Sequence, residues 1–484
     1  MDVEIIDLGI IVIFFIGLLI VGYISGRNLK GSDDFAFARG RLRFPVLLGT
    51  LVASTVGASA TIGRAGKAYE VGMAISLTAL AYAVGLLAFA FIAPILRRQQ
   101  LFSIPKVMGK RYGAPSRVVS SIVLIVTTIV LYSAQLIAVG LVGVALLGPL
   151  GVDYQTVVIV GAAIITAYTL MGGMMAVAVT DVVQAVIVFV SLGIILPFYI
   201  IDDLGGAAMA IDLLKPQEGA FLGGLSPWFL IAVALVDIPI CLIDPSLWQK
   251  AAGAQSEKDL RRAVLATAFT FFIWSGFAAC LGVWSAYLIP GLQETLGSDA
   301  ALPQLVATYM PPIIRGICFA ALMAIMMSTA DTALLIAGTT FSLDLLKVSR
   351  PNTDDRTLLK TTRWVIIIIG GCAPVIALSM QGIFEVLLFS FAIFVVAMFA
   401  PVMAAIFWSR ASQVGAMTSA IAAIITLAVA QVMRMDGALP TWMEPIILAL
   451  IVSCVLMISI SYMTTRNGLH STRLIDLDPE DIAS

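Results

Sequence analysis

Four oxygen-bearing side chains lie close together in one long apolar segment of the chain: Ser328, Thr329, Asp331 and Thr332. If this segment is helical, residues three and four positions apart share a face, so the Ser328 hydroxyl lies beside Asp331 and Thr332. A carboxylate within a bilayer is costly and usually faces a cavity or an ion path. An all-oxygen set of ligands suits a small hard cation. The segment therefore predicts a cation site, with hydrogen bonding between membrane helices as the alternative for the hydroxyls.

A second polar segment, residues 53–66, is rich in glycine, serine and threonine. If a membrane helix unwinds there, near Val56 and Gly57, it frees backbone carbonyls that need partners, and a cation is one such partner. We expect this break to face Ser328 and Thr329. The combined carbonyl and hydroxyl oxygens then suit Na⁺.

Several polar residues outside these two clusters are candidates for ion or substrate binding. Asp181 is interpreted as a ligand of a second ion or a station on an exit path, with a plain interfacial aspartate at a helix N-terminus as the alternative. Arg64 would select carboxylates if it points into a vestibule; otherwise it reaches the membrane interface or pairs with Glu70. The candidate substrate-binding residues are Ser54, Thr55, Ser59, Arg64 and Asp237.

The composition requires a membrane to accommodate these elements. Of 484 residues, 60% are hydrophobic and 12% are charged, about half the charged fraction of a soluble protein. The net charge of −1 gives no reason to expect nucleic acid as a partner. The five cysteines form no CxxC pair and the only histidine is His470, which argues against a disulfide framework, a zinc site and histidine catalysis. No nucleophile–base pair is visible, so we do not expect an enzyme.

Apolar runs long enough to cross a bilayer recur along the chain. We expect one transmembrane domain over residues 1–463, followed by a polar tail at 464–484. The thirteen expected spans lie at about 4–24, 45–66, 72–96, 118–147, 155–171, 179–201, 227–247, 262–289, 313–344, 362–380, 383–408, 414–433 and 443–463.

The loop charges predict the orientation of these spans. Lysine and arginine concentrate in the loops after spans 4–24, 72–96, 227–247 and 313–344, and the third of these loops includes Lys250. Basic loops stay in the cytoplasm. The N-terminus is therefore expected outside and the C-terminal tail in the cytoplasm.

Two expected spans are interrupted at corresponding places. Residues 45–201 and 227–408 form two five-span units of similar length, which must be inverted relative to each other because five is odd. Paired broken helices, one in each half, point to a transport site near the middle of the membrane. The interrupting residues are Gly57, Gly63 and Gly66 in the first unit and Asp237, Pro239, Asp244 and Pro245 in the second.

Three short motifs resemble those of the sodium/solute symporter family, which includes bacterial sodium/proline, sialic acid and sugar symporters. Residues 327–335 (MSTADTALL) are similar to the signature of the family's eighth span in the repeat. Residues 172–184 (GGMMAVAVTDVVQ) and 244–254 (DPSLWQKAAGA) are similar to two further family segments. The three motifs occur in order at the corresponding spans, so the resemblance covers most of the chain.

The resemblance implies an all-α fold with a leucine-transporter-type 5+5 inverted repeat, in which 4–24 is an extra helix and 414–463 holds two C-terminal helices. By position, it implies a sodium site made by the carbonyls of Ala53, Val56 and Ile325 and the hydroxyls of Ser328 and Thr329. It also implies a second sodium site in some members, at the positions of Asp181, Ser328, Asp331 and Thr332. Asp331 stands where the sialic acid transporters have serine, and Thr55 stands where the proline symporter has aspartate.

We therefore expect a sodium-coupled symporter that imports a small organic solute by alternating access. Arg64 favours a carboxylate or an amino acid over a sugar. A bacterial inner membrane is the expected location, with Na⁺, the solute and the lipid bilayer as partners. Two alternatives stay open: a proton-coupled symporter with Asp331 or Asp181 as proton carrier, and a transporter-like solute sensor.

Overall fold

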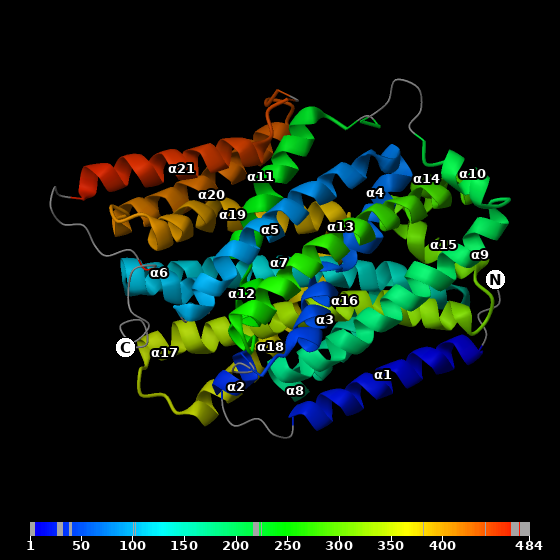
Figure 1. The fold of residues 1–484 in the computed structure, drawn as a ribbon, viewed down its shortest axis with the longest axis horizontal. Helices are drawn as coiled ribbons and strands as arrows, with labels where there is room; N and C mark the ends of the chain where they lie inside the picture. The colour runs from blue at the N-terminus through cyan, green and yellow to red at the C-terminus, as the bar shows by residue number, and fades with distance from the viewer. Residues whose placement is uncertain are drawn as a thin grey trace.

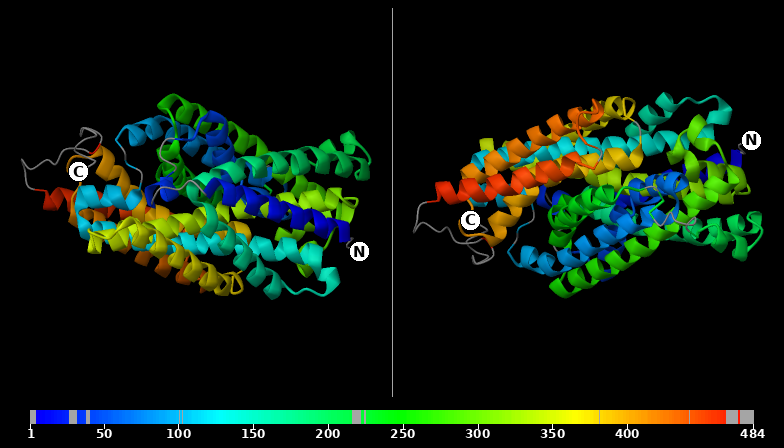
Figure 2. Two further views of the ribbon diagram at one scale, coloured as in Figure 1. Left: turned by 90° about the horizontal axis from the view of Figure 1, so that it is seen from below. Right: turned by 90° about the horizontal axis from the view of Figure 1, so that it is seen from above.

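The computed structural model describes residues 5–26, 32–37, 41–99, 101, 103–215, 222–223, 225–380, 382–440, 442–465 and 474. Long helices run along the longest axis of the molecule (Figure 1). α1 begins at one end of this axis and α21 finishes at the other, as the two further views also show (Figure 2). Within the described ranges, the only β pairing recorded is an isolated bridge between Leu42 and Ala254. The all-α fold is confirmed.

Helices account for most of the described chain. The first half contains α1 (Ile5–Gly26), α2 (Ser32–Phe37), α3 (Phe44–Thr55), η2 (Ser59–Gly63), α4 (Arg64–Val71), η3 (Gly72–Ile75), α5 (Ser76–Arg98), α6 (Ile104–Tyr112), α7 (Ala114–Leu147), η4 (Gly148–Leu150), α8 (Tyr154–Val190), η5 (Ser191–Ile195), α9 (Leu196–Asp203) and α10 (Ala207–Asp212). The second half contains α11 (Pro227–Ile243), α12 (Pro245–Gly253), α13 (Glu257–Leu288), α14 (Leu292–Thr295), η6 (Ser298–Ala300), α15 (Ala301–Tyr309), α16 (Ile314–Thr339), η7 (Thr340–Leu346), α17 (Lys347–Ser349), α18 (Asp355–Ala377), α19 (Ile383–Phe407), α20 (Gln413–Met435) and α21 (Pro445–Thr464).

The number of membrane-crossing helices differs from the expected thirteen for one identifiable reason. In the part of the chain that the structure describes, 12 helices are long and apolar enough to cross a membrane, and Phe44–Thr55 is a shorter apolar helix. The expected span 45–66 is broken into α3, η2 and α4, and the helical segment that follows the break continues into α5. One broken span therefore appears as a short helix and as part of a 40-residue helical segment, Ser59–Arg98.

The first break lies where the glycine-rich segment predicts it. α3 ends at Thr55, and Val56 leaves the helical conformation with φ −84° and ψ 50°. Helix resumes as the π-helical turn η2 and then as α4. The turn at Val56 and Gly57 leaves backbone groups outside a regular helical ladder, at a depth where they need other partners.

The second break falls between α11 and α12, at Asp244. This residue has φ −67° and ψ 117°, and its carboxylate accepts hydrogen bonds from the backbone N–H of Ser246 (2.7 Å) and Leu247 (3.4 Å). Pro245 follows as the first residue of α12, where its missing N–H costs nothing. An aspartate cap followed by proline stops one half-helix and starts the next.

A glycine kink joins the expected spans 155–171 and 179–201. α8 continues through Gly173, which has φ 58°. A Cβ added there would lie 2.7 Å from the Phe35 ring and 2.9 Å from the Phe35 carbonyl oxygen. Both the left-handed backbone and the close approach of α2 require glycine at this position.

α16 is the central helix of the bundle. In the helical segment Ile314–Ser349, which contains α16, an apolar stretch of 18 residues is entirely buried. Only 33% of the corresponding stretch is buried in α20, and 28% in α21. α16 packs against α1, α3, α7, α8 and α18. A polar residue on α16 therefore faces protein, so each of its oxygens needs a partner inside the bundle.

Candidate ion and substrate site

The break after α3 meets α16 at the residues expected to bind a cation. The Ser328 hydroxyl donates to the carbonyl oxygens of Ala53 on α3 and of Ile325 on α16, each at 3.0 Å, so it forms the expected alternative of a hydrogen bond between membrane helices. Its side chain is 1% exposed. Three oxygens from two helices, far apart in the sequence, thus converge at one buried point.

Thr329 adds an oxygen that has no partner within the protein. Its Oγ1 is buried and forms no hydrogen bond in the structure. A Cβ added at Gly57 would lie 2.7 Å from this Oγ1, so the break packs directly against it. A buried hydroxyl without a hydrogen bond is costly, and a cation at this point would accept its lone pair. Hydroxyl and carbonyl oxygens are the ligands that a small hard cation such as Na⁺ takes.

A small cavity adjoins the same residues and includes one that the sequence did not single out. It has a volume of about 10 Å³ and is lined by Ala53, Val56, Ile325, Ser328 and Gln184, among others. This is about the space that one water molecule needs. Gln184 is 1% exposed, and neither its amide oxygen nor its amide nitrogen has a hydrogen-bond partner. The signal available in the sequence was its place one helical turn after Asp181.

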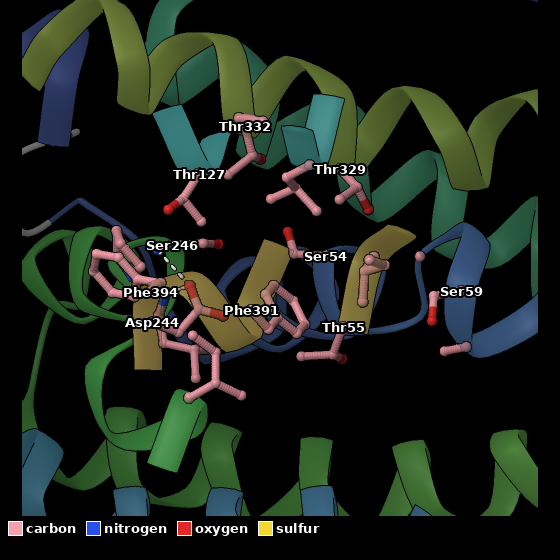
Figure 3. Close-up of a pocket in the computed structure, with 18 of the residues that line it drawn as sticks. Ser54, Thr55, Ser59, Thr127, Asp244, Ser246, Thr329, Thr332, Phe391 and Phe394 are labelled. Carbon is pink, nitrogen blue, oxygen red and sulfur yellow. Dashed lines mark hydrogen bonds between the residues drawn. The ribbon is translucent and has the colours of Figure 1, made fainter. Parts of the chain in front are cut away.

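A larger cavity of about 100 Å³ begins at the break and extends toward α12. The five candidate substrate-binding residues, Ser54, Thr55, Ser59, Arg64 and Asp237, all line it. Figure 3 shows Thr329 and Thr332 on the helix facing Ser54, with Phe391 and Phe394 on α19 beside the serines and Asp244. The remaining wall is largely aromatic and aliphatic, with Tyr82, Phe271 and Phe384 among its residues. The cavity therefore combines an apolar wall with a few polar groups, as small-molecule sites do.

Arg64 lies inside the bundle with its guanidinium partly engaged. It is 3% exposed, and its Nη1 donates to the Ile75 carbonyl (3.1 Å) and to Thr78 Oγ1 (2.6 Å), while Nε has no partner. The alternatives in which it reaches the interface or pairs with Glu70 are wrong, because it is buried and Glu70 binds Lys67 at 2.8 Å. One edge of the guanidinium remains for another partner.

Asp181 belongs to a buried cluster of charges. It is 0% exposed and accepts a hydrogen bond from the Thr50 hydroxyl, so the interfacial alternative is wrong. Lys250, expected in a cytoplasmic loop, is also 0% exposed, and its Nζ lies 3.7 Å from Asp181 Oδ2. Lys250 is buried because α12 continues into the bundle as the second half of a broken helix.

Asp331 is 0% exposed, and neither of its carboxylate oxygens has a hydrogen-bond partner. The neighbouring Thr332 hydroxyl donates to the Ser328 carbonyl at 2.9 Å.

A second charged cluster joins α4, η6 and α19. Lys67 on α4 binds Glu385 on α19 at 3.1 Å, and Asp299 on η6 accepts a hydrogen bond from the Ile383 N–H at 2.6 Å. The pKa of Asp299 is raised to about 7, mainly by burial. The nearby carboxylates of Glu385 and Glu70 also raise this pKa, whereas the hydrogen bond from Ile383 and the positive charge of Lys67 lower it. These contacts tie three elements together and include one carboxyl that titrates near neutrality.

Solved structures of two cation-coupled transporters have a fold similar to this helical bundle. A substrate-bound, outward-open Na⁺-coupled sialic acid symporter matches with a TM-score of 0.78 at 18% identity, over 98% of this chain and 99% of that one. A closed conformation of Mhp1, a nucleobase-cation-symport-1 transporter, matches with a TM-score of 0.61 at 13% identity, over 94% and 99%. The expected leucine-transporter-type fold is confirmed.

The sequence comparisons identify the family. The model of the sodium:solute symporter family matches residues 35–423. The chain is 24% identical to the sodium/proline symporter of Escherichia coli K12, covering 86% of each protein. It is also 24% identical to the sodium/glucose cotransporter of Vibrio parahaemolyticus (87% and 84% covered) and to the human high affinity choline transporter 1 (90% and 78%). The chain belongs to the sodium:solute symporter family, a family of multi-pass membrane transporters with Na⁺ as the coupling ion.

Proposed function

We propose that one Na⁺ binds where the break after α3 meets α16 and that its binding drives import of a small organic solute. The ligands are the carbonyls of Ala53, Val56 and Ile325 and the hydroxyls of Ser328 and Thr329. The observation that carries this proposal is the buried Thr329 Oγ1, which faces the break and lacks any partner. Na⁺ joins α3 to α16 and so favours the arrangement in which the substrate cavity is complete.

The cavity supports an amino acid or another small carboxylate as the solute. Arg64 and Asp237 place opposite charges on its wall and interact electrostatically. A zwitterion complements such a wall better than a sugar does, because its carboxylate and ammonium each find an opposite charge. The rings of Phe271, Phe384 and Phe391 favour an apolar body between the two charged groups. Relatives named for proline and choline are consistent with small charged solutes.

Alternating access follows from the position of the breaks. α3, α4 and α5, together with α11, α12 and α13, form one unit that rocks against the rest of the bundle around the ion site. The charged cluster of Lys67, Glu385 and Asp299 closes the outer side, and the buried cluster around Lys250 closes the cytoplasmic side. We propose a bacterial inner membrane, with the N-terminus outside and the C-terminus in the cytoplasm; the tail expected at 464–484 lies largely outside the described residues.

The membrane potential is sufficient to drive accumulation with one ion. Moving one positive charge inward is worth about 2.3 kcal/mol per 100 mV, before the sodium concentration gradient is counted. That free energy concentrates a neutral or zwitterionic solute by more than tenfold, since about 1.4 kcal/mol corresponds to tenfold.

The experiment is a thermal-shift screen of amino acids, carboxylates and sugars on the purified protein, with and without Na⁺. A solute that raises the unfolding temperature only in Na⁺ is then tested for uptake into proteoliposomes. Ser328→Ala or Thr329→Ala should lower the apparent sodium affinity by about tenfold, for the loss of one ligand oxygen worth about 1.4 kcal/mol. Ser459→Ala is the matched control, because this exposed hydroxyl bonds only within its own helix. Unchanged sodium dependence in both site variants would refute the proposed ion site.

The same experiment separates the two alternatives. Uptake driven by a pH gradient without Na⁺ would identify a proton-coupled symporter that uses Asp331 or Asp181. Sodium-dependent solute binding without any transport would identify a solute sensor.

A further inference from the structure

Three charged side chains from three helices lie together beside the proposed ion site. Asp181 comes from α8, Lys250 from α12 and Asp331 from α16, and each is 0% exposed. All three interact electrostatically with one another. Burying charge in a membrane protein is costly unless the charges compensate each other. The sum of charges in this cluster therefore constrains what else binds there.

The Lys250 ammonium is held in place from two sides. Its Nζ donates to the Thr50 carbonyl at 2.9 Å and to the Ser54 hydroxyl, both on α3, and it lies 3.7 Å from Asp181 Oδ2 on α8. Two hydrogen-bond acceptors and one carboxylate match the three N–H groups of an ammonium. These contacts keep the positive charge between the helix that carries the sodium ligand Ala53 and the helix that carries Asp181.

The carboxylates of Asp331 and Asp181 have oxygens that can still accept a hydrogen bond or bind a cation. Neither oxygen of Asp331 has a hydrogen-bond partner in the structure, and the same holds for Asp181 Oδ1. The Asp244 carboxylate also interacts with Lys250, but it is held by the backbone N–H groups of Ser246 and Leu247 at the start of α12. Asp181 and Asp331, together with the Lys250 ammonium, leave one negative charge uncompensated. Asp331 follows the proposed ligand Ser328 by three residues on the same helix, so the two side chains share a face and the carboxylate lies on the side of the helix that carries the Ser328 hydroxyl. One Na⁺ brings the sum of the four charges to zero.

We propose that Lys250 acts as a built-in second cation, so that this transporter binds one Na⁺ and not two. The inference rests on the proposed sodium site and adds the number of ions coupled at it. A second Na⁺ at Asp181 would lie next to the Lys250 ammonium, and the repulsion between two buried positive charges excludes it. Lys250 thus supplies permanently, from α12, the charge that a second ion would supply reversibly.

Equilibrium binding of radioactive ²²Na⁺ to the purified full-length protein tests this proposal without the solute. The wild type should bind one Na⁺ per protein. Lys250→Met leaves two carboxylates without their internal cation, so this variant should bind two. Lys250→Met combined with Asp331→Asn removes one charge of each sign and should bind one again. Lys258→Met, which removes an exposed lysine from the start of α13, is the matched control and should behave as the wild type.

A further variant keeps the test decisive if Lys250→Met does not fold. Asp331→Asn alone leaves Asp181 and Lys250 balanced without any ion, so its sodium affinity should fall by about tenfold or more. Two Na⁺ bound by the wild type would overturn the proposal, as would one Na⁺ bound by a folded Lys250→Met variant. A stoichiometry of one in the wild type that rises to two in Lys250→Met supports it, and Ser328→Ala should bind the one Na⁺ about tenfold more weakly. A wild type that binds no Na⁺ would refute the proposed function itself, which distinguishes the two failures.

Discussion

Gly57→Ala should weaken sodium binding by adding a single methyl group. The new Cβ would lie 2.7 Å from Thr329 Oγ1, 3.6 Å from its Cβ and 3.8 Å from its Cγ2. Ordinary contact begins at about 3.4 Å, so only the hydroxyl clashes, and it must withdraw by about 0.7 Å. A rotation of the threonine side chain achieves this at low cost to folding, but it removes the hydroxyl from the proposed ion site.

The magnitude follows from that displacement. Loss of one ligand oxygen should cost about 1.4 kcal/mol, or about tenfold in sodium affinity. If the threonine does not rotate, overpacking should instead cost about 1–3 kcal/mol of stability. Sodium titration followed by thermal unfolding separates the two, because the first effect appears only in the sodium dependence and the second at every sodium concentration.

A double-mutant cycle makes the test specific. Thr329→Ala removes the atom with which the new methyl group clashes, so adding Gly57→Ala to that variant should have no further effect on sodium affinity. Gly371→Ala on α18 is the control, since a Cβ there meets nothing within 4 Å. Wild-type sodium affinity in Gly57→Ala, or full additivity of the two substitutions, would refute the proposed contact between Thr329 and the ion.

Two further predictions concern the ends of the same site. Burial raises the pKa of Asp299 from 3.8 to about 7, so the folded protein holds the Asp299 proton more tightly than the unfolded chain does. The free energy of unfolding should therefore fall as the pH rises from about 4 to 7, by at most about 4 kcal/mol. Asp299→Asn should flatten this dependence, and an unchanged slope of unfolding temperature against pH would contradict the assignment. Gln184→Leu replaces the amide that lines the 10 Å³ cavity with an apolar side chain and should lower sodium affinity by about two- to tenfold. Gln184→Glu should retain or raise sodium affinity, and equal loss in both variants would show that Gln184 only packs.

The features predicted well from the sequence are those encoded within a short stretch of the chain. Glycine near Val56 and the pair Asp244 and Pro245 break helices for local reasons, so breaks fall at these expected positions. The expected interruption at Asp237 and Pro239 is wrong, because both lie within the continuous helix α11. Ser328 and Thr329 can be predicted as candidate ion ligands because hydroxyls in an otherwise apolar helix require partners.

The features that were missed depend on contacts between distant segments. Lys250 has the sequence context of a basic loop, and only the packing of α12 against α3 and α16 buries it beside Asp181. Gln184 becomes notable only when α8 is seen to line a cavity shared with Ala53 and Ile325. Local sequence does not report such long-range proximity, and a motif similarity identifies the positions without giving their partners.

Solute binding by the purified protein in Na⁺, compared with K⁺ or choline at equal ionic strength, tests the central claim most directly. The site formed by α3 and α16 predicts that the solute found in the screen binds tightly in Na⁺ alone, and that Thr329→Ala shifts the required sodium concentration upward by about tenfold. Equal solute affinity in all three salts, or a Thr329→Ala variant with the wild-type sodium requirement, would contradict it.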